Sequence, residues 1–119
     1  MLPTDAKSRK ETPLFTGLIK YFPDALAAVA RVSFAGNQQH NPGQPLHWAR
    51  EKSKDHEDCA ARHLFEVGTL DLTDNPPQRH SAKLVWRALA ILQLEIEAEW
   101  RLMGDGQPAK PTEKFPDKD

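Results

Sequence analysis

Two rows of charged residues, separated by a short connector, are the strongest chemical signal in the sequence. His80, Lys83 and Arg87 are spaced i, i+3 and i+7, which places them on one stripe of a helix. A second predicted helix carries a row on the side opposite its apolar face, made of Asp55, Asp58, Arg62 and Glu66. Because a short connector favours antiparallel packing, we expect the acidic row to lie near the basic row.

These rows permit two interpretations. In the first they are a lattice of structural ion pairs, and the acidic residues simply suit the first turn of a helix. In the second the carboxylates hold Mg²⁺, which prefers oxygen ligands completed by water and substrate phosphates. The neighbouring Lys, Arg and His would then neutralise phosphate charge during a hydrolysis reaction.

A histidine and cysteine group offers weaker alternatives. His56, Cys59 and His63 share one flank of the second helix, and with His80 they would complete a four-ligand zinc site. Cys59 also lies one turn from both histidines, as a nucleophile with a base would, but no oxyanion-hole sequence accompanies it. Single cysteines at such positions are most often packing residues.

A polar loop before the second helix could read a nucleobase. Its amide, imidazole and indole side chains can hydrogen-bond to a base edge or stack on a base, and they are Asn37, Gln39, His40, Asn41, His47 and Trp48. The alternative is a well-anchored loop in which the amides cap helix ends and Trp48 packs on the core.

The elements that position these residues are three predicted helices bounded by Pro and Gly. The first runs from Pro23 to Gly36, and the second from an N-cap at Ser53 to Gly68. The third spans residues 80–103 and is so apolar that we expect it to be buried around most of its circumference. No window alternates with period two over strand length, which predicts an all-α fold of three main helices with a long ordered loop between the first two.

Composition limits the remaining possibilities. The 119 residues suffice for one domain, and the formal net charge of −1 argues against a protein that binds nucleic-acid polymers nonspecifically. No stretch is long and apolar enough for a membrane span, and the N-terminus lacks a signal-peptide pattern, so we expect a cytoplasmic protein. We expect residues 1–10 and 104–119 to be disordered and residues 11–103 to form a single helical domain.

The sequence also resembles a known family. The segments that carry the resemblance are YFPDALAAVARVSFAGNQQHNPGQPLHW, KSKDHEDCAARHLFEVGTLD and RHSAKLVWRALAILQLE, within residues 8–97. They resemble the small phage-type dATP/dGTP diphosphohydrolases, which are similar to the MazG-like all-α nucleoside triphosphate pyrophosphohydrolases. The most specific pieces are NQQHNPG followed by LHW, the pattern DxxxRH of Asp58, Arg62 and His63, and HSAK.

The resemblance implies a metal-dependent hydrolase that converts a purine deoxynucleoside triphosphate to the monophosphate and pyrophosphate. Its role would be to adjust the nucleotide pool in phage replication, in the host cytoplasm. The ExxE and ExxD ligand motifs usual in MazG-like enzymes are absent from the paired helices.

The rows of charged residues and the resemblance together suggest a role for each candidate residue. The acidic row predicts the metal ligands Asp55, Asp58 and Glu66, with Mg²⁺ or Mn²⁺. The catalytic residues would be Asp58, Arg62, His63, His80 and Lys83. The substrate-binding residues would be Asn37, Gln39, His40, Asn41, His47, Trp48, Lys52 and Arg87. MazG-like folds are usually oligomeric, so a homodimer or homotetramer is expected, whereas a non-catalytic nucleotide-binding or protein-interaction module is the competing hypothesis.

Overall fold

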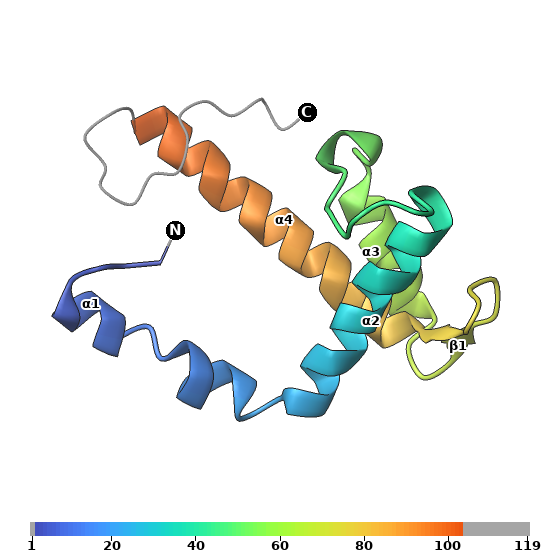
Figure 1. The fold of residues 1–119 in the computed structure, drawn as a ribbon, viewed down its shortest axis with the longest axis horizontal. Coiled ribbons are helices and arrows are strands. Elements are labelled where there is room, and N and C mark those ends of the chain that lie inside the picture. The colour runs from blue at the N-terminus through green and yellow to red at the C-terminus, as the bar shows by residue number, and fades with distance from the viewer. Residues whose placement is uncertain (1, 104–119) are drawn as a thin grey trace. The chain divides into compact units, whose positions relative to one another are not determined.

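The computed structural model describes residues 2–103, which form a mostly helical chain with one small hairpin (Figure 1). In chain order the elements are α1 (Ala6–Lys10), the π-helix η1 (Phe15–Ile19), α2 (Pro23–His40), the 3₁₀-helix η2 (Arg50–Lys52), α3 (His56–Phe65), β1 (Leu70–Asp71), β2 (Gln78–Arg79) and α4 (His80–Met103). The predicted all-α class is confirmed. The addition is the antiparallel pair β1–β2, in which Leu70 lies opposite Arg79 and Asp71 opposite Gln78. The expected disordered tail, 104–119, lies outside the described residues.

The chain divides into two units, and of the described residues the first contains 2–23 and 92–103. Its α1 falls inside the segment 1–10 that we expected to be disordered. The helix begins because the Asp5 side chain accepts a hydrogen bond from the Ser8 amide, at 2.9 Å, which satisfies one of the open amides of the first turn. The carboxylate therefore supplies the local order that composition alone did not indicate.

The second unit, Asp24–Ile91, contains nearly all of α2, which is longer than predicted. The helix starts at Pro23 as expected but continues through Gly36 to His40. Buried Asn37 donates to the Gln44 carbonyl at 3.0 Å, and this contact offsets the cost of about 1 kcal/mol that a helical glycine carries. The helix ends before Pro42, because a proline disfavours helical geometry in the residue before it.

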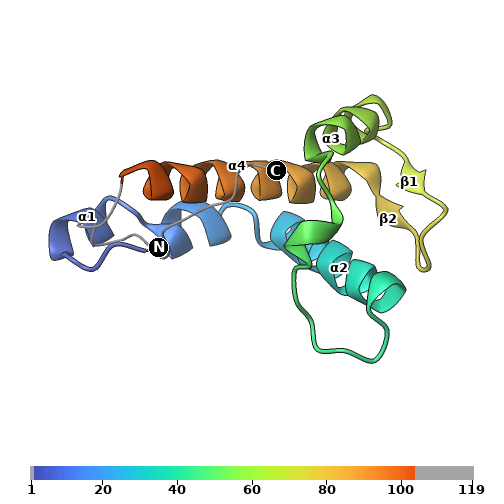
Figure 2. The ribbon, with the colours of Figure 1, turned by 90° about the horizontal axis from the view of Figure 1, so that it is seen from above.

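The predictions for α3 and α4 differ in accuracy. The bounds of α4, His80–Met103, match the predicted helix. The helix α3 begins two residues later than predicted, with Asp55 in place of Ser53 at the N-cap position, and it ends at Phe65, before Gly68. The Ser53 hydroxyl accepts a hydrogen bond from Arg87. Gly68 has a φ of +98° in the turn after α3, a conformation that glycine adopts without strain. Figure 2 shows the β1–β2 hairpin joining the end of α3 to the start of α4.

Few hydrophobic side chains are buried in the described part of the chain. They are Val29, Cys59, Ala82 and Ala90. The expectation that α4 is buried around most of its circumference is therefore wrong for the single chain, since Val85 is 40% exposed and Leu89 is 47% exposed. No described helix combines the length and apolar character needed to cross a bilayer.

Candidate active site

The helices α3 and α4 pack antiparallel, as the short connector predicted. Nδ1 of His63, near the end of α3, lies 2.9 Å from Nδ1 of His80 at the start of α4. Two turns further along, a guanidinium nitrogen of Arg87 lies 2.9 Å from Nδ1 of His56 at the start of α3. The two contacts run in opposite directions along the two helices. The basic row of α4 therefore meets an imidazole row of α3.

The acidic row of α3 does not face α4. Asp55, Asp58 and Glu66 are all exposed, at the N-cap, in the first turn and at the C-cap of α3. The buried residues of α3 are instead His56, Cys59 and His63. The expectation that the acidic row lies near the basic row is corrected, because burying three carboxylates costs far more than burying neutral imidazoles and a thiol.

Lys83 finds its anionic partners in the hairpin. Its ammonium lies 2.8 Å from Asp71 and 2.6 Å from Asp74, and the three side chains are only 12–20% exposed. The hydrogen bonds to Lys83 and Thr73 hold the pKa of Asp71 well below its usual range. Burial alone would lower the pKa of Lys83, but the bonds and charges of the two carboxylates outweigh it and raise that pKa. Lys83 is thus a fixed, charge-compensated cation.

The pair His63–His80 sits beside this ion-pair cluster. Burial, with the positive charges of Lys83 and Arg62, lowers the pKa of His63 below its ordinary value. His63 is therefore uncharged near neutral pH. The two rings approach each other through their Nδ1 atoms. With nothing bound between them, Nδ1–H of one ring donates a hydrogen bond to the unprotonated Nδ1 of the other.

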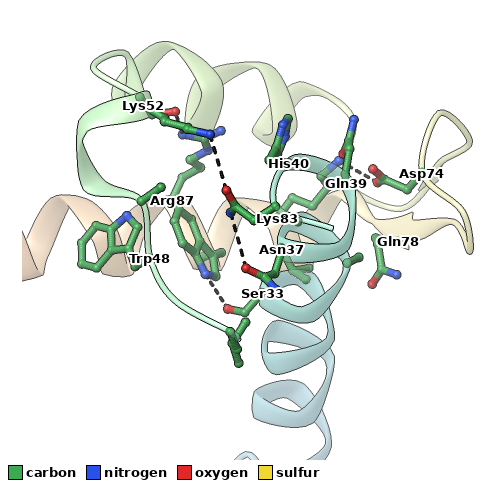
Figure 3. Close-up of a pocket in the computed structure, with 18 of the residues that line it drawn as sticks. Ser33, Asn37, Gln39, His40, Trp48, Lys52, Asp74, Gln78, Lys83 and Arg87 are labelled. Carbon is green, nitrogen blue, oxygen red and sulfur yellow. Dashed lines mark hydrogen bonds and ion pairs between the residues drawn. The ribbon is translucent and has the colours of Figure 1, made fainter. Parts of the chain in front are cut away.

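A pocket of about 460 Å³ opens between α2, the polar loop and the α3–α4 pair, wholly within the second unit (Figure 3). Eleven predicted site residues line it: Asn37, Gln39, His40, Asn41, His47, Trp48, Lys52, Arg62, His63, Lys83 and Arg87. Four others do not: Asp55, Asp58, Glu66 and His80. The volume is in the range of sites for nucleotide-sized ligands.

One wall of the pocket is aromatic. Trp48 and Trp86 meet edge to face with ring centroids 5.8 Å apart, and the His56 ring lies 6.2 Å from Trp86. The Trp86 indole donates to the Ser33 hydroxyl at 2.8 Å, which ties α4 to α2. The Arg50 guanidinium lies 4.2 Å from the centre of the Trp48 ring. Both indoles are therefore held in fixed orientations.

Amide side chains also line the pocket. Asn41 donates to the Asn37 side chain at 3.4 Å, and Lys52 donates to the Asn41 side chain at 3.5 Å (Figure 3). Asn37 is buried, whereas Gln39 and His40 are exposed at the end of α2. This chain of polar contacts anchors the loop and still presents donors and acceptors to the pocket.

A family model described as dATP/dGTP diphosphohydrolase, N-terminal, matches residues 3–103. The chain belongs to this family. No curated protein and no solved structure is significantly similar to it. The family name points to hydrolysis of a purine deoxynucleotide, in line with the predicted activity class.

Several pocket residues of this diphosphohydrolase-family chain were not predicted from sequence. They are Ser33, Ser53, Asp74, Gln78 and Trp86, among others, and His56 was considered only as a zinc ligand or as a base for Cys59. Asp74 had a usable signal, because a buried Lys83 requires carboxylates and the connector LDLTDNPPQ holds two of them. Ser33 and Trp86 carried no such signal, since their contact joins positions far apart in the sequence.

The structure gives no support to a zinc site at His56, Cys59 and His63 or to Cys59 as a nucleophile. His56, Cys59 and His63 are buried between the helices, and Cys59 does not line the pocket. Among residues 2–103, the group with metal-ligand spacing is His63, Asp71 and His80.

Proposed function

We propose that this chain hydrolyses a purine deoxynucleoside triphosphate to the monophosphate and pyrophosphate in the pocket described above, and so adjusts a nucleotide pool. The observation that carries the proposal is that one pocket is lined both by aromatic and amide side chains and by the cations Lys52, Arg62 and Arg87. A purine suits the first and a polyphosphate the second. The family name supports the same substrate class.

Arg87 is the leading candidate for phosphate binding. The partners to which it donates are the neutral Ser53 hydroxyl and the His56 ring nitrogen, so its positive charge remains available to an anion. Lys83 differs, because two carboxylates already neutralise its charge. Exposed Arg62 and Lys52 also line the pocket and would contact the outer phosphates.

A divalent cation would supply further neutralisation of phosphate charge, as in most phosphoryl-transfer enzymes. The described residues do not offer a fitting Mg²⁺ cage. Asp55, Asp58 and Glu66 are not among the residue groups whose ligand atoms come close enough to share an ion. The group that does come together contains two imidazoles, whereas Mg²⁺ prefers oxygen.

The test of the reaction is incubation of the purified protein with each of the four dNTPs and Mg²⁺ or Mn²⁺, with products resolved by ion-exchange chromatography. We expect monophosphate and pyrophosphate from a purine dNTP, and loss of turnover in EDTA. Release of orthophosphate and a diphosphate would contradict the proposed cleavage position. Absence of turnover with every nucleotide would contradict the reaction itself.

Nucleotide binding without hydrolysis is the second candidate function. It is favoured by the charge balance at Lys83, whose ammonium is already engaged by Asp71 and Asp74. It predicts saturable binding of a purine dNTP with no product in the same chromatograms.

Replacing Trp48 by Ala should raise the KM for the purine dNTP by about tenfold and leave kcat nearly unchanged. The reason is the loss of a stacking surface, which is worth about 1–3 kcal/mol per base. Steady-state kinetics measure it. Trp100→Phe is the control, because Trp100 lies outside the pocket. An unchanged KM in Trp48→Ala would contradict the proposal that the base stacks on Trp48.

We also propose that the chain assembles with a second copy of itself, as a dimer or tetramer. The buried hydrophobic side chains of the described residues include two alanines and no Leu, Ile or Phe, which is little for a stable isolated domain. Val85 and Leu89 are exposed one turn apart on α4, as expected of a face covered by a partner helix.

Replacing Leu89 by Glu should therefore convert the assembly to monomer, measured by size-exclusion chromatography with light scattering. The new carboxylate would be buried in the apolar contact between the two copies, without water or a charged partner, and this would destabilise the contact. Gln38→Glu places the same charge on an exposed position of α2 and should leave the assembly intact. A wild-type monomer at micromolar concentration would contradict the proposal.

A further inference from the structure

Three side chains with metal-ligand chemistry converge where the hairpin meets the two helices. His63 comes from the end of α3, Asp71 from β1, and His80 is the first residue of α4. One ligand atom from each lies within 4.8 Å of the other two. His63 also lines the nucleotide-sized pocket, so the group borders the proposed phosphate-binding side.

The separation of the two imidazoles restricts the geometry of a shared ion. Nδ1 of His63 and Nδ1 of His80 are 2.9 Å apart. At a metal–nitrogen distance of about 2.1 Å, two ligands at right angles are about 3.0 Å apart and two tetrahedral ligands about 3.4 Å apart. The observed distance fits adjacent positions of an octahedral ion. It also fits a direct hydrogen bond between the two rings, and the experiments below distinguish that hydrogen bond from a shared metal ion.

The carboxylate of the group is already held in place. Oδ1 of Asp71 accepts from the Thr73 hydroxyl at 2.6 Å and from the Thr73 amide at 3.1 Å. Oδ2 accepts from Lys83 at 2.8 Å, which leaves this oxygen a second lone-pair direction for a metal ion. Carboxylates that bind metals are commonly oriented by hydrogen bonds of this kind. A modest side-chain adjustment brings Asp71 onto an ion held by both imidazoles.

We propose that His63, Asp71 and His80 bind one divalent transition-metal ion of the Mn²⁺ to Zn²⁺ series in six-coordinate geometry. Two nitrogen donors and one carboxylate suit these ions, whereas Mg²⁺ favours oxygen ligands throughout. The remaining positions are filled by water or by phosphate oxygens entering from the pocket. This site replaces the exposed carboxylates of α3 as the metal centre and extends the proposed function to a specific class of cation.

The first test is a metal titration of the EDTA-treated full-length protein, without nucleotide. Co²⁺ is followed by its visible absorption, and Mn²⁺ and Mg²⁺ by calorimetry. We expect one Co²⁺ per chain with the weak absorption bands of a six-coordinate ion, and affinity for Mg²⁺ at least about a hundredfold lower than for Mn²⁺. No binding of Co²⁺ or Mn²⁺ at millimolar concentration overturns the proposal in favour of a plain hydrogen bond between the rings.

The second test uses matched variants. His80→Gln and Asp71→Asn should each weaken Co²⁺ binding by at least about tenfold, while His40→Gln, at an exposed histidine outside the group, should bind as the wild type does. Circular dichroism shows whether each variant is folded. Unchanged Co²⁺ affinity in a folded His80→Gln protein overturns the site. Because no nucleotide is present, failure here is distinguishable from failure of the proposed hydrolysis.

Discussion

Replacing Arg87 by Met should lower kcat/KM for the purine dNTP by about a hundredfold or more. Arg87 lines the pocket and donates to the Ser53 hydroxyl and to Nδ1 of His56, neither of which is a carboxylate. Its charge is therefore the one most available to a triphosphate, and loss of one well-placed donor to developing phosphate charge costs about two to three orders of magnitude in rate. Steady-state kinetics with the wild-type and variant proteins measure the effect.

The matched control is Arg79→Met. Arg79 is exposed on β2 and does not line the pocket, so this variant removes the same charge from the protein without touching the proposed site. We expect it to retain wild-type kinetics. Equal losses in the two variants would mean that net charge, and not a contact with phosphate, explains the effect. Thermal unfolding of Arg87→Met separates a lost contact from a lost fold.

Replacing Lys83 by Met should lower the free energy of unfolding by about 3 kcal/mol, because breaking a buried ion pair leaves charge uncompensated. Here the charges left behind are the carboxylates of Asp71 and Asp74, which are 14% and 12% exposed. They would face each other without the ammonium that now lies between them. Urea denaturation followed by circular dichroism measures the change.

Two further variants make this prediction specific. Lys7→Met removes an ion pair with Glu11 in which both side chains are more than 60% exposed, so its cost should stay within about 0.5 kcal/mol. Adding Asp74→Asn to Lys83→Met removes the repulsion between the carboxylates and should restore part of the loss. A Lys83→Met protein as stable as Lys7→Met would contradict the assignment of Lys83 as the centre of the cluster.

Local sequence signals were enough to select several of the residues that line the pocket. The residues of 37–48 that we selected as base-reading groups do line one pocket together with Lys83 and Arg87. Their types and their shared position in one polar segment were enough to select them. Whether they contact a base stays a prediction, which the Trp48 variant tests.

Local sequence patterns did not identify the proposed metal ligands. The acidic stripe of α3 is regular in sequence, yet its members are exposed and lie outside the pocket. The group that does converge takes one residue each from α3, β1 and α4. No spacing rule within one helix could have selected Asp71, which lies in a connector that composition describes only as rich in turns.

The sequence by itself determined the start of α2 and the extent of α4, because the signals for these bounds are local. Pro23 and the apolar spacing set the start of α2, and the mostly apolar residues 82–94, with a glycine following Met103, indicated α4. Only the tertiary structure decided which face of α3 meets α4. The exposed residues of the acidic row remain in water, while His56, Cys59 and His63 are buried. The physical reason is the cost of desolvation: imidazoles can be buried uncharged and hydrogen-bonded, whereas three carboxylates cannot.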